Sequence, residues 1–176
     1  MFNPYSTIMK KQPLISVIVA SYNYAKYIKE TLDSLIRQTN KSFEVIVVDD
    51  GSKDQSLPII EEYANRFKNI KLYTHPGNQN RGLAETVILG IEKSNGEYIA
   101  FCESDDYWTN NHIEYLQDTI QQNPLANFIV NGIKVINLSN NPEYDSYIEF
   151  SSSFLKKHSG LSLIHISEPT RHAQIS

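Results

Sequence analysis

The chain has 176 residues, of which 40% are hydrophobic and 20% charged, and its formal net charge at pH 7 is −4. This length and composition suit one globular domain with a buried core, which argues against a disordered chain. The acidic balance and the lack of a Lys/Arg block argue against nucleic acid as a partner, although they leave a mononucleotide open.

The single cysteine, Cys102, excludes a disulfide within the chain and favours a reducing compartment. We therefore expect a cytoplasmic location, with peripheral attachment to the inner face of a membrane left open. Lys10 and Lys11 precede the apolar stretch 14–20, as in a signal peptide, but Ser16 interrupts that stretch and polar residues follow it. No segment of the sequence approaches the length of a membrane span.

Short β-branched runs alternate with amphipathic stretches along the chain. Strands are predicted at 14–20, 43–50, 70–75, 97–101 and 127–136. Helices are predicted before Gln38 and at 56–67, 82–94 and 109–124, with Pro58 in the first turn of the second helix and Thr109 as the cap of the last. The alternation predicts an α/β fold with an open, mostly parallel, twisted sheet, right-handed crossovers and helices on both faces.

Ligands of such sheets bind beyond the carboxyl ends of the strands, near the point where the strand order reverses. The segments that follow the first four predicted strands are 21–23, 49–50, 75–82 and 103–106. We expect all four to face one crevice.

Three acidic residues, Glu103, Asp105 and Asp106, follow the fourth strand. Like charges repel at close range, and unpaired charge is costly to hold at a sheet end. Mg²⁺ or Mn²⁺ would offset that cost, since these ions use one or two protein carboxylates and complete their shell with water and phosphate oxygens. The alternative is that Asp105 or Asp106 caps the next helix. Thr109 is better placed to cap, which leaves both carboxylates for a metal.

Asp50 lies in the segment VVDDGSKD, where a plain turn residue is one interpretation. Tyr22, after the first strand, favours another interpretation, in which Tyr22 and Asp50 bind a nucleotide base. An aromatic ring can stack on a base while a carboxylate accepts the N–H of that base. Packing at the rim is the alternative for Tyr22.

Three segments together resemble the successive motifs of family 2 glycosyltransferases, inverting nucleotide-sugar enzymes with the Rossmann-like GT-A fold. They are ISVIVASYNYAKYIKETLDSLIRQTNKSFEVIVVDDGSKDQS, NRGLAETVILGI and GEYIAFCESDDYWT. The resemblance runs from about Pro13 to Asn131. Because several ordered motifs agree, it is specific for the family, but it does not identify the donor sugar or the acceptor.

The resemblance implies a set of donor-binding residues. Ala20, Ser21 and Tyr22 correspond to the segment that lines the nucleoside site, and Asp50 to the aspartate that reads the base, commonly uracil. Glu103, Ser104 and Asp105 correspond to the D-x-D signature, with Glu in place of the first Asp.

Asp105 would then lie near the ribose and diphosphate and contribute to the metal site, for which Asp106 is the first choice. Val87 and Ile88 stand where the family often has a polar pair such as Arg and Asn. Arg81 could supply the cation toward the diphosphate instead, or be a solvated surface residue. Gly82 would serve close backbone approach or turn geometry.

The implied reaction is direct displacement at the anomeric carbon of a nucleotide-diphosphate sugar, UDP-linked by the base assignment, with a glycan or lipid as acceptor. The family's general base is a carboxylate later in the domain. Asp145 and Glu149 qualify by residue type alone, so no catalytic residue is assigned. Alternatives are a non-catalytic nucleotide-binding remnant and a receiver-like phosphoacceptor domain, although such a domain normally has its acidic pair after the first strand. The chain lacks the G-x-G-x-x-G motif expected of a dinucleotide oxidoreductase after the first strand. It also lacks the glycine-rich, basic first loop expected of a sugar nucleotidyltransferase.

The segment LSLIHISEPTR, residues 161–171, resembles one reading frame of the transposon-end adapter used in sequencing-library preparation. A native amphipathic strand is the alternative. We expect a non-native tail at 161–176 and a natural protein that continues past Gly160, so that the GT-A domain is C-terminally truncated. The expected organisation is an extension at 1–12, an incomplete nucleotide-sugar-binding domain at 13–138, and a loop or the start of an acceptor region at 139–160.

Overall fold

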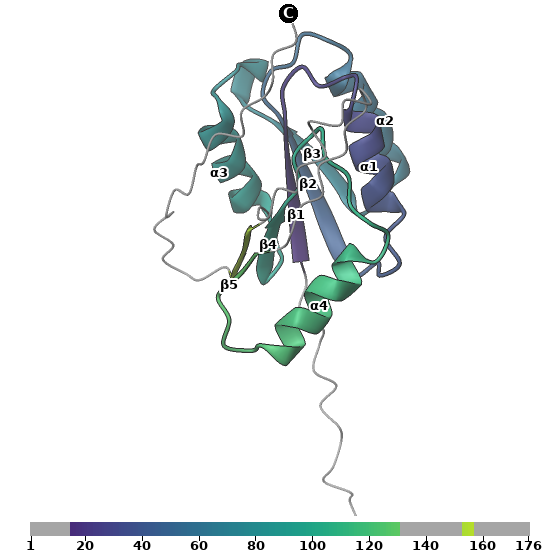
Figure 1. Ribbon diagram of the computed structural model, residues 1–176. Helices are drawn as coiled ribbons and strands as arrows, with labels where there is room; N and C mark the ends of the chain where they lie inside the picture. The colour runs from purple at the N-terminus through teal and green to yellow at the C-terminus, as the bar shows by residue number, and fades with distance from the viewer. Residues whose placement is uncertain (1–14, 131–152, 157–176) are drawn as a thin grey trace, which may run out of the picture.

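The computed structural model describes residues 15–130 and 153–156 (Figure 1). The expected N-terminal extension, the adapter-like tail, Asp145 and Glu149 lie outside these residues. The strands are β1 Ile15–Ser21, β2 Phe43–Asp49, β3 Ile70–Thr74, β4 Tyr98–Phe101, β5 Phe128–Val130 and β6 Ser153–Lys156. The helices are α1 Ile28–Ile36, α2 Ser56–Arg66, α3 Leu83–Lys93 and α4 His112–Gln122, with a short 3-10 turn at Pro76–Asn78.

The six strands form one sheet in the order β3-β2-β1-β4-β6-β5. The first four strands are mutually parallel, with Ile15 of β1 aligned with Phe43 on one side and Tyr98 on the other. Strand β6 is antiparallel to both β4 and β5. The order reverses between β1 and β4, so the carboxyl end of β1 is the place where this fold class binds ligands.

Helices cover both faces of the sheet, as predicted, with α3 on one side and α1 and α2 on the other (Figure 1). Alternate residues of β1 point to opposite faces, as in any strand. Val17 and Val19 join the core cluster that includes Leu32 of α1. Ile18 faces α3, where a Cβ on Gly90 would come within 2.6 Å of its side chain. Both faces of β1 are therefore packed, which explains its continuous apolar sequence.

Most predicted elements are confirmed within one or two residues, including Pro58 in the first turn of α2. The predicted cap of the last helix is wrong: α4 begins at His112, not Thr109, and no side chain of its own caps it. Gln38 takes that role from a distance, because its Oε1 accepts the backbone N–H of Ile113 at 3.0 Å. Of the strand expected at 127–136, the described part is β5.

Strand β6 was not predicted, since it lies in the stretch expected to be loop or the start of an acceptor region. None of the helices in the described ranges is long and apolar enough to span a bilayer.

Candidate functional site

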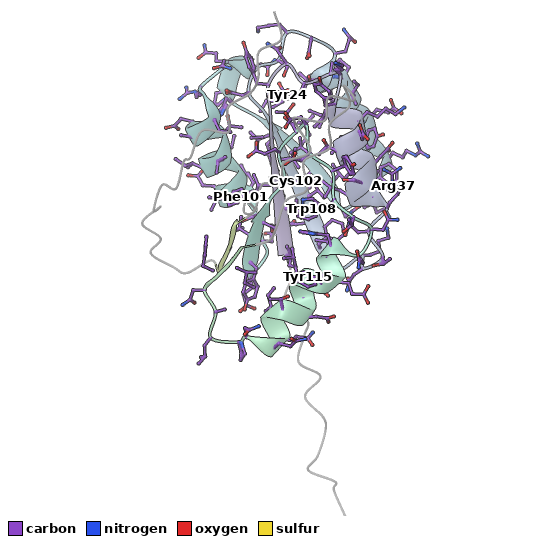
Figure 2. The ribbon with its side chains drawn as sticks, in the orientation of Figure 1. Tyr24, Arg37, Phe101, Cys102, Trp108 and Tyr115 are labelled. Atoms are coloured by element: carbon purple, nitrogen blue, oxygen red, sulfur yellow. The ribbon has the colours of Figure 1, made fainter. Side chains whose placement is uncertain are left out.

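The segments expected to form the site meet at the carboxyl end of the parallel strands. The backbone N–H of Asp50 donates to the carbonyl of Ser21 at 2.8 Å, and that of Cys102 donates to the carbonyl of Ile18 at 3.0 Å. These bonds extend the pairing of β1 with its two neighbours beyond the strand ends. Tyr24 lies at this end of the sheet, the upper end in Figure 2.

Asp49 and Asp50 end β2 and have different partners. Asp49 is fully buried and accepts the backbone N–H of Ser52 at 2.9 Å and its hydroxyl at 2.5 Å, so it shapes the turn. Asp50 is 4% exposed, and its two oxygens accept the backbone N–H groups of Arg81 at 2.7 Å and Gly82 at 2.9 Å. Asp50 thus anchors the loop before α3. A carboxylate has about four acceptor positions, so two backbone donors leave capacity for another.

A buried histidine completes this anchor. Nε2 of His75 lies 3.5 Å from Oδ1 of Asp50 and 3.1 Å from Oγ1 of Thr86. The Thr86 hydroxyl donates to the carbonyl of Gly82 at 2.9 Å, so its oxygen accepts from His75. In this arrangement Nε2 of His75 carries a proton. His75 fell in a predicted site segment, but the sequence did not indicate its pairing with Asp50.

Glycines serve two different purposes in these loops. Gly51 has φ +76°, and a Cβ there would lie 2.7 Å from the carbonyl oxygen of Asn78 and 2.9 Å from the nitrogen of Asn80. Gly82 has φ +85° but open space around its Cβ position. The positive φ of Gly82 agrees with the turn geometry expected for it, and Gly51 is the glycine that lets protein backbone approach closely.

The loop after β1 is hydrogen-bonded to the loop after β2. Asn23, with φ +58°, accepts the backbone N–H of Lys53 through Oδ1 at 2.7 Å, and its own N–H donates to the hydroxyl of Ser52 at 2.9 Å. The next two backbone N–H groups donate to Ser56 and Asp54. These bonds fix the chain that follows Tyr22, whose side chain is 42% exposed at the rim.

The remaining predicted nucleoside residues lie beside Tyr22. Ala20 is half-buried, and Ser21 is 1% exposed. Within the described residues, the hydroxyl of Ser21 has no hydrogen-bond partner. The side chain of Arg81 is exposed on the loop held by Asp50.

The acidic loop presents its three carboxylates to solvent. Glu103, Asp105 and Asp106 are exposed, whereas Ser104 between them is 4% exposed. Burial, and then the charges of Asp106, Glu103 and Asp105, raise the pKa of the Cys102 thiol well above its usual value. Burial, followed by the charges of Asp105 and Glu103, also raises the pKa of Tyr24. Tyr24 therefore lies within the field of this loop, a neighbour that the sequence did not reveal.

The donor set at this loop fits a hard divalent cation, because all its ligand atoms are carboxylate oxygens. Among residues 15–130 and 153–156, no three His, Cys, Asp or Glu side chains gather closely enough to hold a metal ion by themselves. The arrangement matches an ion that takes one or two carboxylates and draws its other ligands from water and a bound phosphate.

Comparison with known proteins identifies the family. The model of the family described as "Glycosyl transferase family 2" matches residues 16–173. The chain belongs to this family. An uncharacterized glycosyltransferase of Haemophilus influenzae is 37% identical over 114 residues, which cover 65% of this chain and 45% of that protein. The uncharacterized glycosyltransferase EpsJ of Bacillus subtilis is 39% identical over 113 residues, 64% of this chain and 32% of that protein. The chain thus spans less than half the length of these relatives.

Solved structures confirm the GT-A fold. Residues 1–349 of S. aureus TarS, solved in complex with UDP-GlcNAc, align with a TM-score of 0.65 and 34% identity over 73% of this chain and 36% of that one. The mannosyltransferase PcManGT from Pyrobaculum calidifontis, solved with GDP-Man and Mn²⁺, aligns with a TM-score of 0.63 over 84% of this chain and 45% of that one. It is 20% identical, so this likeness concerns the fold alone.

Proposed function

We propose that this chain is the donor-binding part of an inverting, metal-assisted glycosyltransferase that uses a UDP-linked sugar and a glycan or lipid acceptor. The observation that carries the proposal is the gathering of exposed Tyr22, buried Asp50 and the exposed acidic loop at the carboxyl end of the parallel strands. This is the ligand-binding edge of the fold class. The likeness to TarS, solved with UDP-GlcNAc, supports a uridine nucleotide.

Each side chain has a distinct role in the proposal. Tyr22 stacks on the base, for which its exposed ring is available. Asp50 accepts the ring N–H of uracil with the acceptor capacity that its two backbone donors leave unused. Ala20 and Ser21 line the nucleoside, and the unpartnered hydroxyl of buried Ser21 is available to a polar group of the nucleotide.

The acidic loop orients the diphosphate. Asp106, with Asp105, would hold Mg²⁺ or Mn²⁺, and Asp105 also contacts the ribose side of the donor, with Glu103 and Ser104 beside it. When bound, the metal would supply Lewis-acid stabilisation of the charge that develops on the leaving diphosphate. Arg81 adds a cation on the loop held by Asp50, and Gly82 gives that loop its turn.

Transfer with inversion also needs a general base that removes the proton of the acceptor hydroxyl. We place this base among carboxylates beyond the described residues, and neither Asp145 nor Glu149 is assigned to it. A cytoplasmic location, with or without peripheral attachment to the inner membrane face, completes the proposal and depends on the single cysteine.

Titration calorimetry of the chain with UDP, in MnCl₂ and in EDTA, tests the donor site. We expect Mn²⁺ to raise the affinity for UDP at least about tenfold, equivalent to about 1.4 kcal/mol. Asp106→Asn should remove this gain, whereas Asp118→Asn, an exposed carboxylate on α4, should retain it. Equal affinity in both conditions would refute the metal assignment, and tighter binding of GDP than of UDP would refute the base assignment.

A further inference from the structure

Three buried polar side chains lie on the side of α1 that faces the acidic loop. Thr31, Ser34 and Gln38 are spaced by three and four residues and are each 1% exposed. Residues at this spacing share one face of a helix and its continuation. A buried polar group is costly unless it is hydrogen-bonded, so the partners of these side chains explain why the chain has them there.

All three bind the backbone of the segment that carries the acidic residues. The hydroxyl of Thr31 donates to the carbonyl of Ser104 at 2.9 Å. The hydroxyl of Ser34 accepts the backbone N–H of Trp108 at 3.1 Å and donates to the carbonyl of Thr31 at 2.7 Å.

Gln38 bridges the end of the same segment. Its Nε2 donates to the carbonyl of Thr109 at 2.8 Å, while its Oε1 accepts the N–H of Ile113 in α4. The three side chains thus anchor the segment at its beginning, its middle and its junction with α4.

The anchored positions and the carboxylates alternate between inside and outside. Ser104 and Trp108 are buried, whereas Asp105 and Asp106 between them are exposed. The segment has no strand or helix between Phe101 and His112 to hold its path. Its three like charges repel one another, which favours spreading of an unanchored loop. Bonds from a packed helix to the flanking backbone oppose that spreading before any ligand arrives.

We infer that Thr31, Ser34 and Gln38 are positioning residues that preorganise Asp105 and Asp106 for the metal and diphosphate. This inference rests on the proposed function. Thr31 has the most direct effect, because the carbonyl that it binds belongs to the peptide joining Ser104 to Asp105. These residues touch no substrate; they act through the loop.

The test uses two variants of Thr31. Thr31→Val removes the hydroxyl and keeps the shape of the side chain, whereas Thr31→Ser keeps the hydroxyl. The matched control is Ser16→Ala, which deletes another fully buried hydroxyl, hydrogen-bonded to Glu44 and Gly96 near the amino ends of the strands. We expect Thr31→Val to reduce the Mn²⁺-dependent gain in UDP affinity about 3- to 10-fold, the range expected for one hydrogen bond. Affinity in EDTA should be unchanged, and Thr31→Ser and Ser16→Ala should keep the gain.

A second readout is independent of ligand. Trp108 is the only tryptophan of the chain, and it lies in the anchored segment, over the sheet and above α4 in Figure 2. Without metal or nucleotide, we expect acrylamide to quench its fluorescence more strongly in Thr31→Val than in the wild type, Thr31→Ser or Ser16→Ala. Unchanged quenching in Thr31→Val overturns the inference. It is also overturned if Ser16→Ala loses as much of the Mn²⁺-dependent gain in UDP affinity as Thr31→Val does. A different result separates the two claims. If Mn²⁺ does not raise the UDP affinity of the wild type, but Thr31→Val is still quenched more strongly than the wild type, the metal site is refuted and the anchoring of the loop is supported.

Discussion

The carboxylate of Asp50 accepts the backbone N–H of Gly82 at 2.9 Å and so joins the end of β2 to the residue that precedes α3. Its other oxygen accepts the adjacent N–H of Arg81. The residue proposed to read the base therefore also holds the loop that leads into α3. Changes at Asp50 should affect both stability and donor affinity.

Asp50→Asn tests this double role. An amide has one acceptor oxygen, and its NH₂ would face a backbone N–H, so at least one of the two bonds must be lost. We expect the free energy of unfolding, measured by urea denaturation, to fall by about 1–3 kcal/mol. UDP affinity should fall as well. Asp118→Asn, exposed on α4, should change neither quantity, and an Asp50→Asn protein as stable as the wild type would contradict the anchoring role.

Gly51→Ala and Gly77→Ala form a second test. Both glycines have positive φ, +76° and +70°, so an alanine at either site is strained by about 1–2 kcal/mol. At Gly51 the new methyl would also lie 2.7 Å from backbone, whereas at Gly77 the nearest atom is 3.8 Å away, in a side chain. We expect Gly51→Ala to cost at least about 1 kcal/mol more than Gly77→Ala in urea denaturation, because overpacking typically adds that much. Equal costs would show that the loops yield to the methyl group.

The sequence was sufficient to predict what depends on local pattern. The β-branched run that became β1 and the amphipathic spacing of Ile28, Leu32 and Leu35 in α1 follow from burial alone. Because parallel strands end at one edge, the sequence also predicted that Tyr22 and Asp50 belong to one region. The roles of these residues toward a nucleotide stay predictions.

Contacts between residues distant in sequence could not be predicted. Gln38 caps α4 across 75 residues, and no local signal distinguishes it from any polar residue at a helix end. The pairing of His75 with Asp50 likewise depends on how the loops pack. Strand β6 was missed because its four residues are too few to show an alternating pattern and its partner β4 is far away along the chain.

Glu44 supports a prediction about acid stability. Burial alone would raise the pKa of Glu44, but hydrogen bonds from Lys71, Ser16 and Asn95 outweigh it and lower the pKa to about 2. A carboxylate with a folded-state pKa below its ordinary 4.5 stabilises the protein above pH 4.5, and that contribution is lost as the pH falls toward 2. Between pH 4.5 and 2, the free energy of unfolding of the wild type should fall by about 1–3 kcal/mol because Glu44 becomes protonated.

The Glu44→Gln variant isolates that contribution. It should be less stable than the wild type at pH 7, and the difference should shrink as the pH falls from 4.5 toward 2. Unfolding free energies from urea titrations at several pH values measure it. Glu61→Gln, exposed on α2, should follow the wild-type curve throughout. A constant difference between Glu44→Gln and the wild type would mean that packing rather than charge sets the effect.

His112 gives the chain a second pH dependence, at less acidic values. Its ring packs against Trp108 with 4.3 Å between centroids, and burial lowers its pKa to about 4 from the ordinary 6.5. Between pH 6.5 and 4 the unfolded chain therefore binds a proton that the folded protein does not. The stabilising effect of the neutral ring is complete above pH 6.5 and is lost progressively as the pH falls toward 4.

The loss should be about 1–2 kcal/mol, less than the full pKa shift implies, because the ring is partly solvated. His112→Phe keeps a flat ring against Trp108 and cannot titrate, so its unfolding free energy should fall less between pH 6.5 and 4. Tyr115→Phe, an exposed ring on the same helix, should keep the wild-type slope. Parallel curves for the wild type and His112→Phe would assign the acid sensitivity to other groups.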